Sequence, residues 1–310
     1  MTHSCNQMPD LRSLPGIRLS NPTVGHSLSD QIQQPQDTSP SSDVRHERPT
    51  DVWAYISPSR LNTWLRCPRA FKLRYIDGIR SPPSTNLFVG KVAHSGLERF
   101  YRHKQMGVTL TEAEVVQHLE MRWEAMATED HVVFTDTRDE ARLRTQAATL
   151  VTAYLTQVPA EEPAPTLVET RLKAPLVDPF TGEDLGIELL GIVDLVVNEA
   201  SGQIICDFKT STRSSGPVEI IHEVQLTAYA YLFRQLFHEL EAGLEIRSLI
   251  KTKIPKIEIH RYSPRTQAHF RRFFQIVRQY LDDLDRGEFV YRPGFGCTMC
   301  EFHDGPCVSD

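Results

Sequence analysis

Two carboxylates and one lysine stand in segments that otherwise read as buried β-strand, because Ile, Val and Phe dominate both runs. The residues Asn198–Gly202 between the runs predict a hairpin turn. A turn centred near Ala200 places Asp194 almost opposite Asp207 on the neighbouring strand. Asp207 and Lys209 are two residues apart, so their side chains point to the same face of a strand. Charged groups are seldom placed there unless they are paired or bind a metal, so we treat these residues as a candidate site.

These three side chains have the composition of a hydrolytic metal site. Two carboxylates at the rim of a sheet can hold Mg²⁺ or Mn²⁺, which prefer oxygen ligands. A lysine on the same face can orient an attacking water or offset the charge that develops on a phosphate. The same spacing also permits a buried Asp–Lys ion pair with no chemistry. The three residues alone leave both interpretations open.

Other polar residues accompany this candidate site along the chain. The sequence predicts a helix over residues 219–241, on which Gln225 and Tyr229 lie four apart and share a face. The residues of this helix that we expect to be buried are Ile220, Val224, Ala228, Tyr231 and Leu232. His94 lies on a helix predicted to begin at Gly90, beside its apolar stripe, where a histidine is more often an ordinary surface or core residue than a ligand. Glu169, in a predicted strand, is a further carboxylate of uncertain direction.

Three cysteines gather near the C-terminus with the spacing Cys297-x-x-Cys300-x6-Cys307. Three thiolates leave one ligand missing from a four-coordinate site. His303 can complete a zinc site locally, or Cys67, far upstream, can complete an iron–sulfur cluster. The spacing does not decide between these alternatives.

The order of the predicted elements indicates an α/β domain over residues 51–310. Residues 1–50 contain no aromatic residue, six prolines and eight serines, and therefore predict a disordered leader. An α-rich part comes first, then a central sheet, then a mixed α/β part. The predicted helices begin at Ser57 and Gly90, cover about 111–127, 138–157 and 219–241, and begin again at Ser263. The predicted strands cover 167–172, 187–197, 203–210, 244–252 and 256–261.

Basic residues are concentrated in two segments, although the formal net charge is −6. Ser59–Arg80 holds six Arg or Lys against one acid, and Lys251–Arg278 holds eight against one acid. We prefer a groove that contacts phosphates over solvated helix faces. The candidate contacts are Arg60, Arg66, Arg69, Lys251 and Lys253.

Five sequence elements in this order resemble the PD-(D/E)XK nuclease superfamily, most closely its RecB-like branch. They are Ser57-Pro58-Ser59-Arg60-Leu61 with Cys67-Pro68-Arg69-Ala70-Phe71, then Gly90-x-x-x-His94, Asp194, Asp207-Phe208-Lys209 and Gln225-x-x-x-Tyr229. The resemblance runs from about Ile56 to Cys307. One departure is that Ile192-Val193 stands where a proline can precede the first aspartate.

The resemblance implies a restriction-endonuclease-like core, a central mixed sheet flanked by helices, and a role for each motif residue. His94, Asp194, Asp207 and the main-chain carbonyl of Phe208 are expected to bind Mg²⁺ or Mn²⁺. Lys209 is expected to act on the water or the transition state. Gln225 and Tyr229 are expected to position that lysine or the DNA backbone. Glu169 is a weaker candidate.

The resemblance also favours the cluster over zinc in the tail. RecB-like nucleases of the AddB type, and the CRISPR-associated adaptation nuclease, combine one early cysteine with three late ones to hold a [4Fe–4S] cluster. Cys67, Cys297, Cys300 and Cys307 match that arrangement. The cluster is expected to staple the first helix to the segment of about 290–310 without redox work.

We therefore expect a metal-dependent deoxyribonuclease, exonucleolytic on single strands or DNA ends, that acts in repair, recombination or CRISPR adaptation. The alternative is a non-catalytic DNA-binding or scaffold subunit of a helicase–nuclease complex. No Gly-x4-Gly-Lys-Ser/Thr loop is present, so we expect a motor or CRISPR integration proteins to be separate partners. No apolar run approaches the roughly 20 residues that span a bilayer, and a signal-peptide core is lacking, so we expect a cytoplasmic protein.

Overall fold

One mixed β-sheet organises the computed structural model, which describes residues 52–159, 161–214 and 219–308. Neighbouring strands follow the order β1-β3-β4-β5-β6, and β2 pairs with β3. The pairs β1–β3 and β4–β5 are parallel, and the other pairs are antiparallel. The strands are β1 (Tyr55–Ile56), β2 (Pro165–Val177), β3 (Asp184–Glu199), β4 (Gly202–Ser211), β5 (Gly243–Ile250) and β6 (Lys256–Tyr262). The leader predicted for residues 1–50 lies outside the described residues.

The β3–β4 hairpin has the register that the sequence predicts. Glu199 pairs with Gly202, which leaves a two-residue turn that includes Ala200. Gly202 has a φ of +114°, a conformation that favours glycine. Pairing continues to Leu195 opposite Cys206, so the next step brings Asp194 opposite Asp207. The prediction that these two carboxylates share the end of one hairpin is therefore confirmed.

Side-chain caps define where the helices begin. The Ser57 hydroxyl accepts a hydrogen bond from the Arg60 N–H and starts α1, as predicted. Ser84 caps α3 in the same way through Leu87, so the predicted start at Gly90 is wrong. The helices are α1 (Pro58–Arg66), α2 (Pro68–Phe71), α3 (Thr85–Gln105), α4 (Glu112–Glu129), α5 (Thr137–Leu155), α6 (Glu219–Phe237) and α7 (Gln267–Arg286), with a π-helical turn at Lys72–Ile76 and a 3₁₀ turn at Phe295–Met299.

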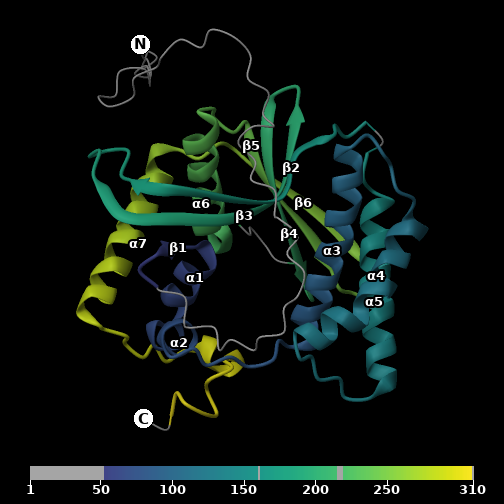
Figure 1. The fold of residues 1–310 in the computed structure, drawn as a ribbon, viewed down its shortest axis with the longest axis horizontal. Coiled ribbons are helices and arrows are strands. Elements are labelled where there is room, and N and C mark those ends of the chain that lie inside the picture. The colour runs from purple at the N-terminus through teal and green to yellow at the C-terminus, as the bar shows by residue number, and fades with distance from the viewer. Residues whose placement is uncertain (1–51, 160, 215–218, 309–310) are drawn as a thin grey trace, which may run out of the picture. The chain divides into compact units, whose positions relative to one another are not determined.

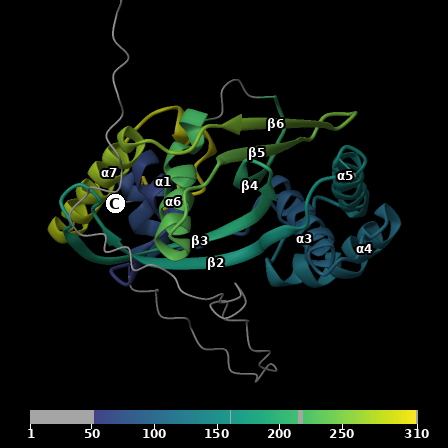
Figure 2. The same cartoon turned by 90° about the horizontal axis from the view of Figure 1, so that it is seen from above.

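Two groups of helices cover opposite faces of the central strands (Figures 1 and 2). The first group, α1, α6 and α7, packs with Ile205 of β4 in one apolar core. The second group, α3, α4 and α5, packs with Ile204, Cys206 and Phe208 of β4 in the other core. Alternate residues of β4 therefore serve different cores. The end of β4 lies where α3 and α6 both approach the sheet, which brings motif residues from distant segments together.

The first turn of helix α6 differs from the sequence prediction. Ile220 was expected to be buried, but it is 79% exposed, and Ile221 is 64% exposed. The other residues expected to be buried pack into or against the first core, together with Leu226 and Tyr229. The two isoleucines in the first turn of α6 are therefore exposed to solvent.

The C-terminal segment returns to α1 and α2. Phe302 is 2% exposed and packs against Ala70 and Leu73. Arg74 forms an ion pair with Glu301, and Arg292 donates a hydrogen bond to the Leu65 carbonyl at 2.6 Å. The architecture confirms an α/β fold with a mixed sheet flanked by helices. Within the described ranges, no helix combines the length and apolar character that crossing a bilayer requires.

Candidate active site

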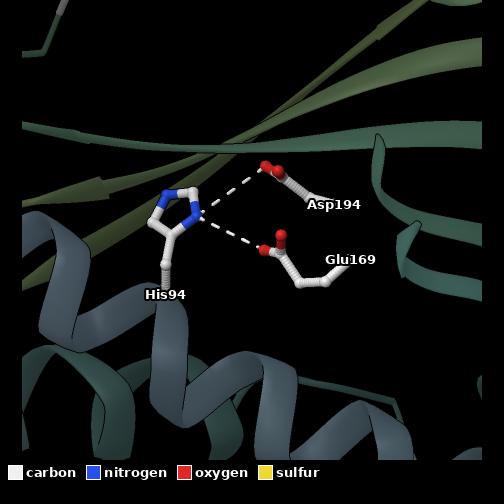
Figure 3. A group of neighbouring side chains, drawn as sticks. All are labelled: His94, Glu169 and Asp194. Carbon is white, nitrogen blue, oxygen red and sulfur yellow. Dashed lines mark ion pairs between the residues drawn. The ribbon is translucent and has the colours of Figure 1, made fainter. Parts of the chain in front are cut away.

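His94, Glu169 and Asp194 form a compact group of potential metal ligands (Figure 3). One ligand atom from each residue lies within 4.8 Å of the others. His94 Nδ1 is 4.0 Å from Glu169 Oε1 and 3.9 Å from Asp194 Oδ2. The three side chains come from α3, β2 and β3 respectively. One imidazole and two carboxylates are a suitable donor set for a divalent cation such as Mn²⁺ or Mg²⁺.

The strand register explains how Glu169 joins this group. Val168 pairs with Leu195 and Thr170 with Val193, so Glu169 stands opposite Asp194. Glu169 has a φ of +42°, in the left-handed region that a non-glycine residue rarely adopts. Such strain persists only where the surroundings enforce it, and it is concentrated at functional sites. The distortion of β2 thus turns the Glu169 carboxylate toward His94 and Asp194.

Asp207 and Lys209 form a second half of the site on the face of β4 that meets α6. Asp207 is 1% exposed, and its Oδ2 lies 2.5 Å from Lys209 Nζ. Its Oδ1 accepts a hydrogen bond from Gln225 Nε2 at 2.8 Å, and the same amide donates to the Tyr229 hydroxyl at 2.8 Å. Asp194 connects the halves, because its Oδ2 accepts the Phe208 N–H at 2.7 Å. The motif residues of β3, β4 and α6 therefore lie together in one site; they are Asp194, Asp207, Lys209, Gln225 and Tyr229.

The electrostatics of the group favour a bound cation. Burial, and then the neighbouring charge of Asp207, hold the pKa of the Asp194 carboxyl well above its usual range. Burial alone lowers the pKa of His94, but the carboxylates of Glu169, Asp194 and Asp207 outweigh it, so the net pKa is raised. The negative charge of these buried carboxylates is thus only partly balanced by positive charge from the protein. A divalent cation supplies the missing positive charge, so these residues fit such a group.

A buried cluster of Tyr101, Tyr154 and Arg247 supports the position of Phe208. The Phe208 ring stacks on Tyr101 at 6.0 Å between centroids and meets the edges of Tyr154 and His94 at 5.4 Å and 5.9 Å. Arg247 Nη1 donates to both tyrosine hydroxyls, at 3.0 Å and 2.7 Å. Because the Phe208 main chain binds Asp194, this packing helps to set the position of the site. No sequence signal marks this cluster, because Tyr and Arg are ordinary core and surface residues.

Glycines let two helices approach the strands of the site. A Cβ at Gly90 of α3 would lie 2.5 Å from Thr210 Oγ1 of β4. A Cβ at Gly191 of β3 would lie 2.8 Å from a Leu232 methyl and 3.0 Å from the Tyr229 ring of α6. Real Cβ atoms are not found so close to another heavy atom. The Gly90-x-x-x-His94 spacing therefore combines a close approach with a histidine one turn further along α3.

Replacing Gly90 with alanine is expected to push α3 away from β4 and move His94. Such overpacking costs about 1–3 kcal/mol of stability, and a shift of about 1 Å costs roughly 10²-fold in a positioned reaction. Chemical denaturation and the affinity for Mn²⁺, measured by titration calorimetry, check this result. A Gly90→Ala, Thr210→Ala double variant removes the clashing hydroxyl and should recover both properties. Equal Mn²⁺ affinities of Gly90→Ala and wild type would contradict the close-approach explanation.

The predicted DNA contacts differ in their exposure. Arg60 is 2% exposed, and its guanidinium donates to the Tyr55 carbonyl at 2.6 Å and covers the Tyr55 ring. This burial removes Arg60 from the candidate contacts, because a buried guanidinium cannot meet a phosphate. Arg66 and Lys253 are exposed, and Arg69 is half-buried. Lys251 is half-buried, and its ammonium donates to the Asn86 carbonyl at 2.9 Å.

The four candidate cysteines line one pocket of about 180 Å³ between α1, α2 and the C-terminal segment. Arg66 and His303 line the same pocket. Burial, and then the thiols of Cys67, Cys300 and Cys297, raise the pKa of Cys307. The structure therefore brings Cys67 together with the three late cysteines, more than two hundred residues away in the chain.

Comparisons with known proteins agree with this geometry. A family model described as "PD-(D/E)XK nuclease superfamily" matches residues 55–304, which include every motif residue of the site. The crystal structure of a "Putative exonuclease" from Eubacterium rectale is similar in fold, with a TM-score of 0.52 and 14% identity over 86% of this chain and 93% of that chain. A second structure, of the protein SSO0001, has a TM-score of 0.39 and 13% identity over 79% and 82% of the two chains, too low a score to carry weight.

No curated protein matches the chain. At 14% identity the structural similarity shows a shared fold and nothing finer. The family model, in contrast, spans most of the chain and includes the converging residues Asp194, Asp207 and Lys209. The chain therefore belongs to the PD-(D/E)XK nuclease superfamily.

Proposed function

We propose that the protein is a metal-dependent deoxyribonuclease of the RecB-like branch that hydrolyses phosphodiester bonds from DNA ends or single strands. One observation carries the proposal: the ligand group His94, Glu169 and Asp194 adjoins the Asp207–Lys209 pair at the end of one hairpin. A merely structural Asp–Lys ion pair does not require the extra carboxylates and the strained Glu169. Nuclease chemistry requires both the metal ligands and the lysine.

The residues of the chain have separate tasks in this proposal. His94, Glu169 and Asp194 would hold Mg²⁺ or Mn²⁺, with Asp207 and the Phe208 carbonyl as further candidate ligands. The cation, when bound, supplies an acidified water and neutralises charge on the phosphate. Lys209 holds its ammonium beside Asp207, where it can orient the attacking water and stabilise charge on a phosphate oxygen. Gln225 holds Asp207 through its amide N–H, and the Tyr229 hydroxyl accepts a hydrogen bond from the same amide. Burial raises the pKa of Tyr229 and keeps the phenol protonated.

Positive charge at the surface supports a nucleic-acid substrate. Lys251 and Lys253 follow β5 directly, and the Lys251 N–H donates to the carbonyl of Ser211 at the end of β4, at 2.7 Å. These lysines thus lie beyond the catalytic end of β4. Arg66 lines the cysteine pocket, and the charge of Arg69 acts on Cys307 of that pocket. Lysine and arginine side chains bind nucleic-acid backbones through phosphate contacts, which weaken as the salt concentration rises.

Linear and circular substrates test the exonuclease part of the proposal. With Mn²⁺, the protein should degrade end-labelled linear single-stranded DNA and release short products. Covalently closed circular single-stranded DNA of the same sequence should remain intact, because it offers no end. Cleavage of the circle at a comparable rate would show an endonuclease and would leave the metal-dependent chemistry in place.

The cysteine pocket supports an iron–sulfur cluster. Its lining includes four cysteines, the number of thiolates that holds a [4Fe–4S] cluster. We propose a [4Fe–4S] cluster on Cys67, Cys297, Cys300 and Cys307 that stabilises the fold.

Replacing Cys67 with serine should remove the cluster and loosen the C-terminal segment. The purified wild type is expected to be brown, with absorption near ~400 nm from iron–thiolate ligation. Cys67→Ser should lose most of the iron and unfold at a lower temperature. Cys5→Ser serves as the matched control, since the sequence assigns Cys5 no role, and it should keep the wild-type spectrum. A colourless wild type that contains zinc would contradict the cluster.

A further inference from the structure

His222 shares the face of α6 that carries the motif residues. It lies three residues before Gln225 and seven before Tyr229, positions that recur on one side of a helix. That side faces β4, since Gln225 Nε2 binds Asp207 Oδ1 at 2.8 Å and Tyr229 is 5% exposed. The exposed Ile220 lies on the other side of the same turn. The helix therefore directs His222 toward the Asp207–Lys209 pair.

The surroundings of His222 determine its charge and its capacity to donate a hydrogen bond. Burial, and then the positive charge of Lys209, lower the pKa of His222, so its ring is neutral at neutral pH and carries one N–H donor. The ring is half-buried, and it forms no hydrogen bond or ion pair with another described residue. In contrast, His103 is bound to the Arg99 carbonyl at 2.9 Å and His269 to Thr266. The ring N–H of His222 is therefore available to a substrate that binds beside Lys209.

We infer that His222 is a substrate-positioning residue of this active site, whose ring N–H donates a hydrogen bond to a phosphate oxygen of the nucleic acid beside Lys209. The inference rests on the proposed nuclease function. A phosphate suits this position because His222 lies in the N-terminal part of a 19-residue helix, where the helix dipole favours an anion, and within the influence of the Lys209 charge. A nucleobase would not require the neighbouring cation.

Binding measured without cleavage tests the inference directly. Fluorescence anisotropy of a labelled single-stranded oligonucleotide in EDTA gives the dissociation constant for wild type, His222→Ala and His222→Asn. Loss of one hydrogen bond to a charged group should weaken binding by about 10-fold or more in His222→Ala. His222→Asn keeps an N–H donor and should recover most of that affinity. His103→Ala is the matched control and should bind as wild type does.

Single-turnover cleavage with Mn²⁺ separates positioning from catalysis and from folding. His222→Ala should raise the half-saturating DNA concentration by a similar factor, while the maximal rate and the Mn²⁺ affinity stay within about threefold of wild type. Equal dissociation constants for wild type and His222→Ala in EDTA would overturn the inference even if the protein is an active nuclease. Loss of Mn²⁺ affinity together with thermal stability in both His222 variants would show a structural role and would also overturn it. A wild type that neither binds nor cleaves DNA would refute the proposed function itself.

Discussion

Replacing Lys209 with alanine is expected to lower the rate of DNA cleavage by about 10²–10³-fold, the cost of removing one preorganised charge from a reacting oxygen. Lys209 Nζ lies 2.5 Å from Asp207 Oδ2, so the ammonium is held at a fixed place beside the ligand group. Single-turnover cleavage of labelled DNA with saturating Mn²⁺ measures the loss. The Mn²⁺ affinity should change far less, since Lys209 is not a ligand.

Two comparisons make this result specific. Lys173→Ala removes a lysine that is paired with Glu188 on β2 and β3, outside the site, and should cleave as wild type does. It also controls for contaminating nucleases, because both variants are purified in the same way. Lys209→Arg keeps the positive charge but replaces a compact ammonium with a planar group, so it should restore only part of the rate. A Lys209→Ala variant that cleaves as fast as Lys173→Ala would remove Lys209 from the mechanism.

Replacing Asp194 with asparagine is expected to abolish metal-dependent cleavage and, at the same time, to stabilise the metal-free protein. The carboxylate is costly in the folded state, because it is buried beside Asp207 and close to Glu169. Asparagine keeps an oxygen that can accept the Phe208 N–H but carries no charge. The midpoint of thermal unfolding in EDTA should rise by on the order of 3 °C for each 1 kcal/mol regained. Such opposite effects on stability and activity are typical of functional residues.

The stabilisation by Asp194→Asn should depend on pH in a defined direction. The pKa of Asp194 is higher in the folded protein than in the unfolded chain, so the unfolded chain ionises first as the pH rises. The folded state therefore loses stability as the pH rises from the usual carboxyl pKa toward the raised folded value. The difference in melting temperature between the variant and wild type should be larger at about pH 8 than at about pH 5. A constant difference across this range would contradict the raised pKa of Asp194.

The hairpin that carries the site could be predicted from sequence because its signals are local. Turn residues around Ala200 set the register, and the register alone brings Asp194 opposite Asp207. The side chains of Asp207 and Lys209 share a face because strand residues alternate. Gln225 and Tyr229 share a face because helix residues recur every three to four positions. Each of these inferences needs only the geometry of one or two neighbouring elements.

Glu169 could not be placed from sequence because β2 breaks the alternation of a strand. Leu167 and Leu172 pack in the same core, although one is an odd-numbered and the other an even-numbered position. The left-handed φ of Glu169 lies between these two residues. No sequence signal marks such a distortion at a glutamate. Glu169 was therefore only a weak candidate from sequence, because its backbone conformation could not be foreseen. The structure groups its carboxylate with His94 and Asp194.

The prediction for Arg60 failed for a different reason. Clustered arginines near aromatic residues suggest a phosphate groove, but one of them covers the Tyr55 ring and binds the Tyr55 carbonyl. Arginine commonly buries its flat guanidinium on an aromatic face, and sequence alone does not separate this use from a surface contact. His222 belongs to none of the motifs, so the sequence alone did not single it out.

Dependence of DNA cleavage on a divalent cation tests the central claim most directly. The purified protein is stripped with EDTA, and hydrolysis of labelled linear single-stranded DNA is followed before and after Mn²⁺ or Mg²⁺ is restored, with Asp194→Asn treated in parallel. We predict no cleavage in EDTA, recovery of cleavage with either cation in wild type, and no recovery in the variant. Cleavage that persists without a cation, or that the Asp194→Asn variant retains in full, would contradict the assignment of this group as the catalytic metal site.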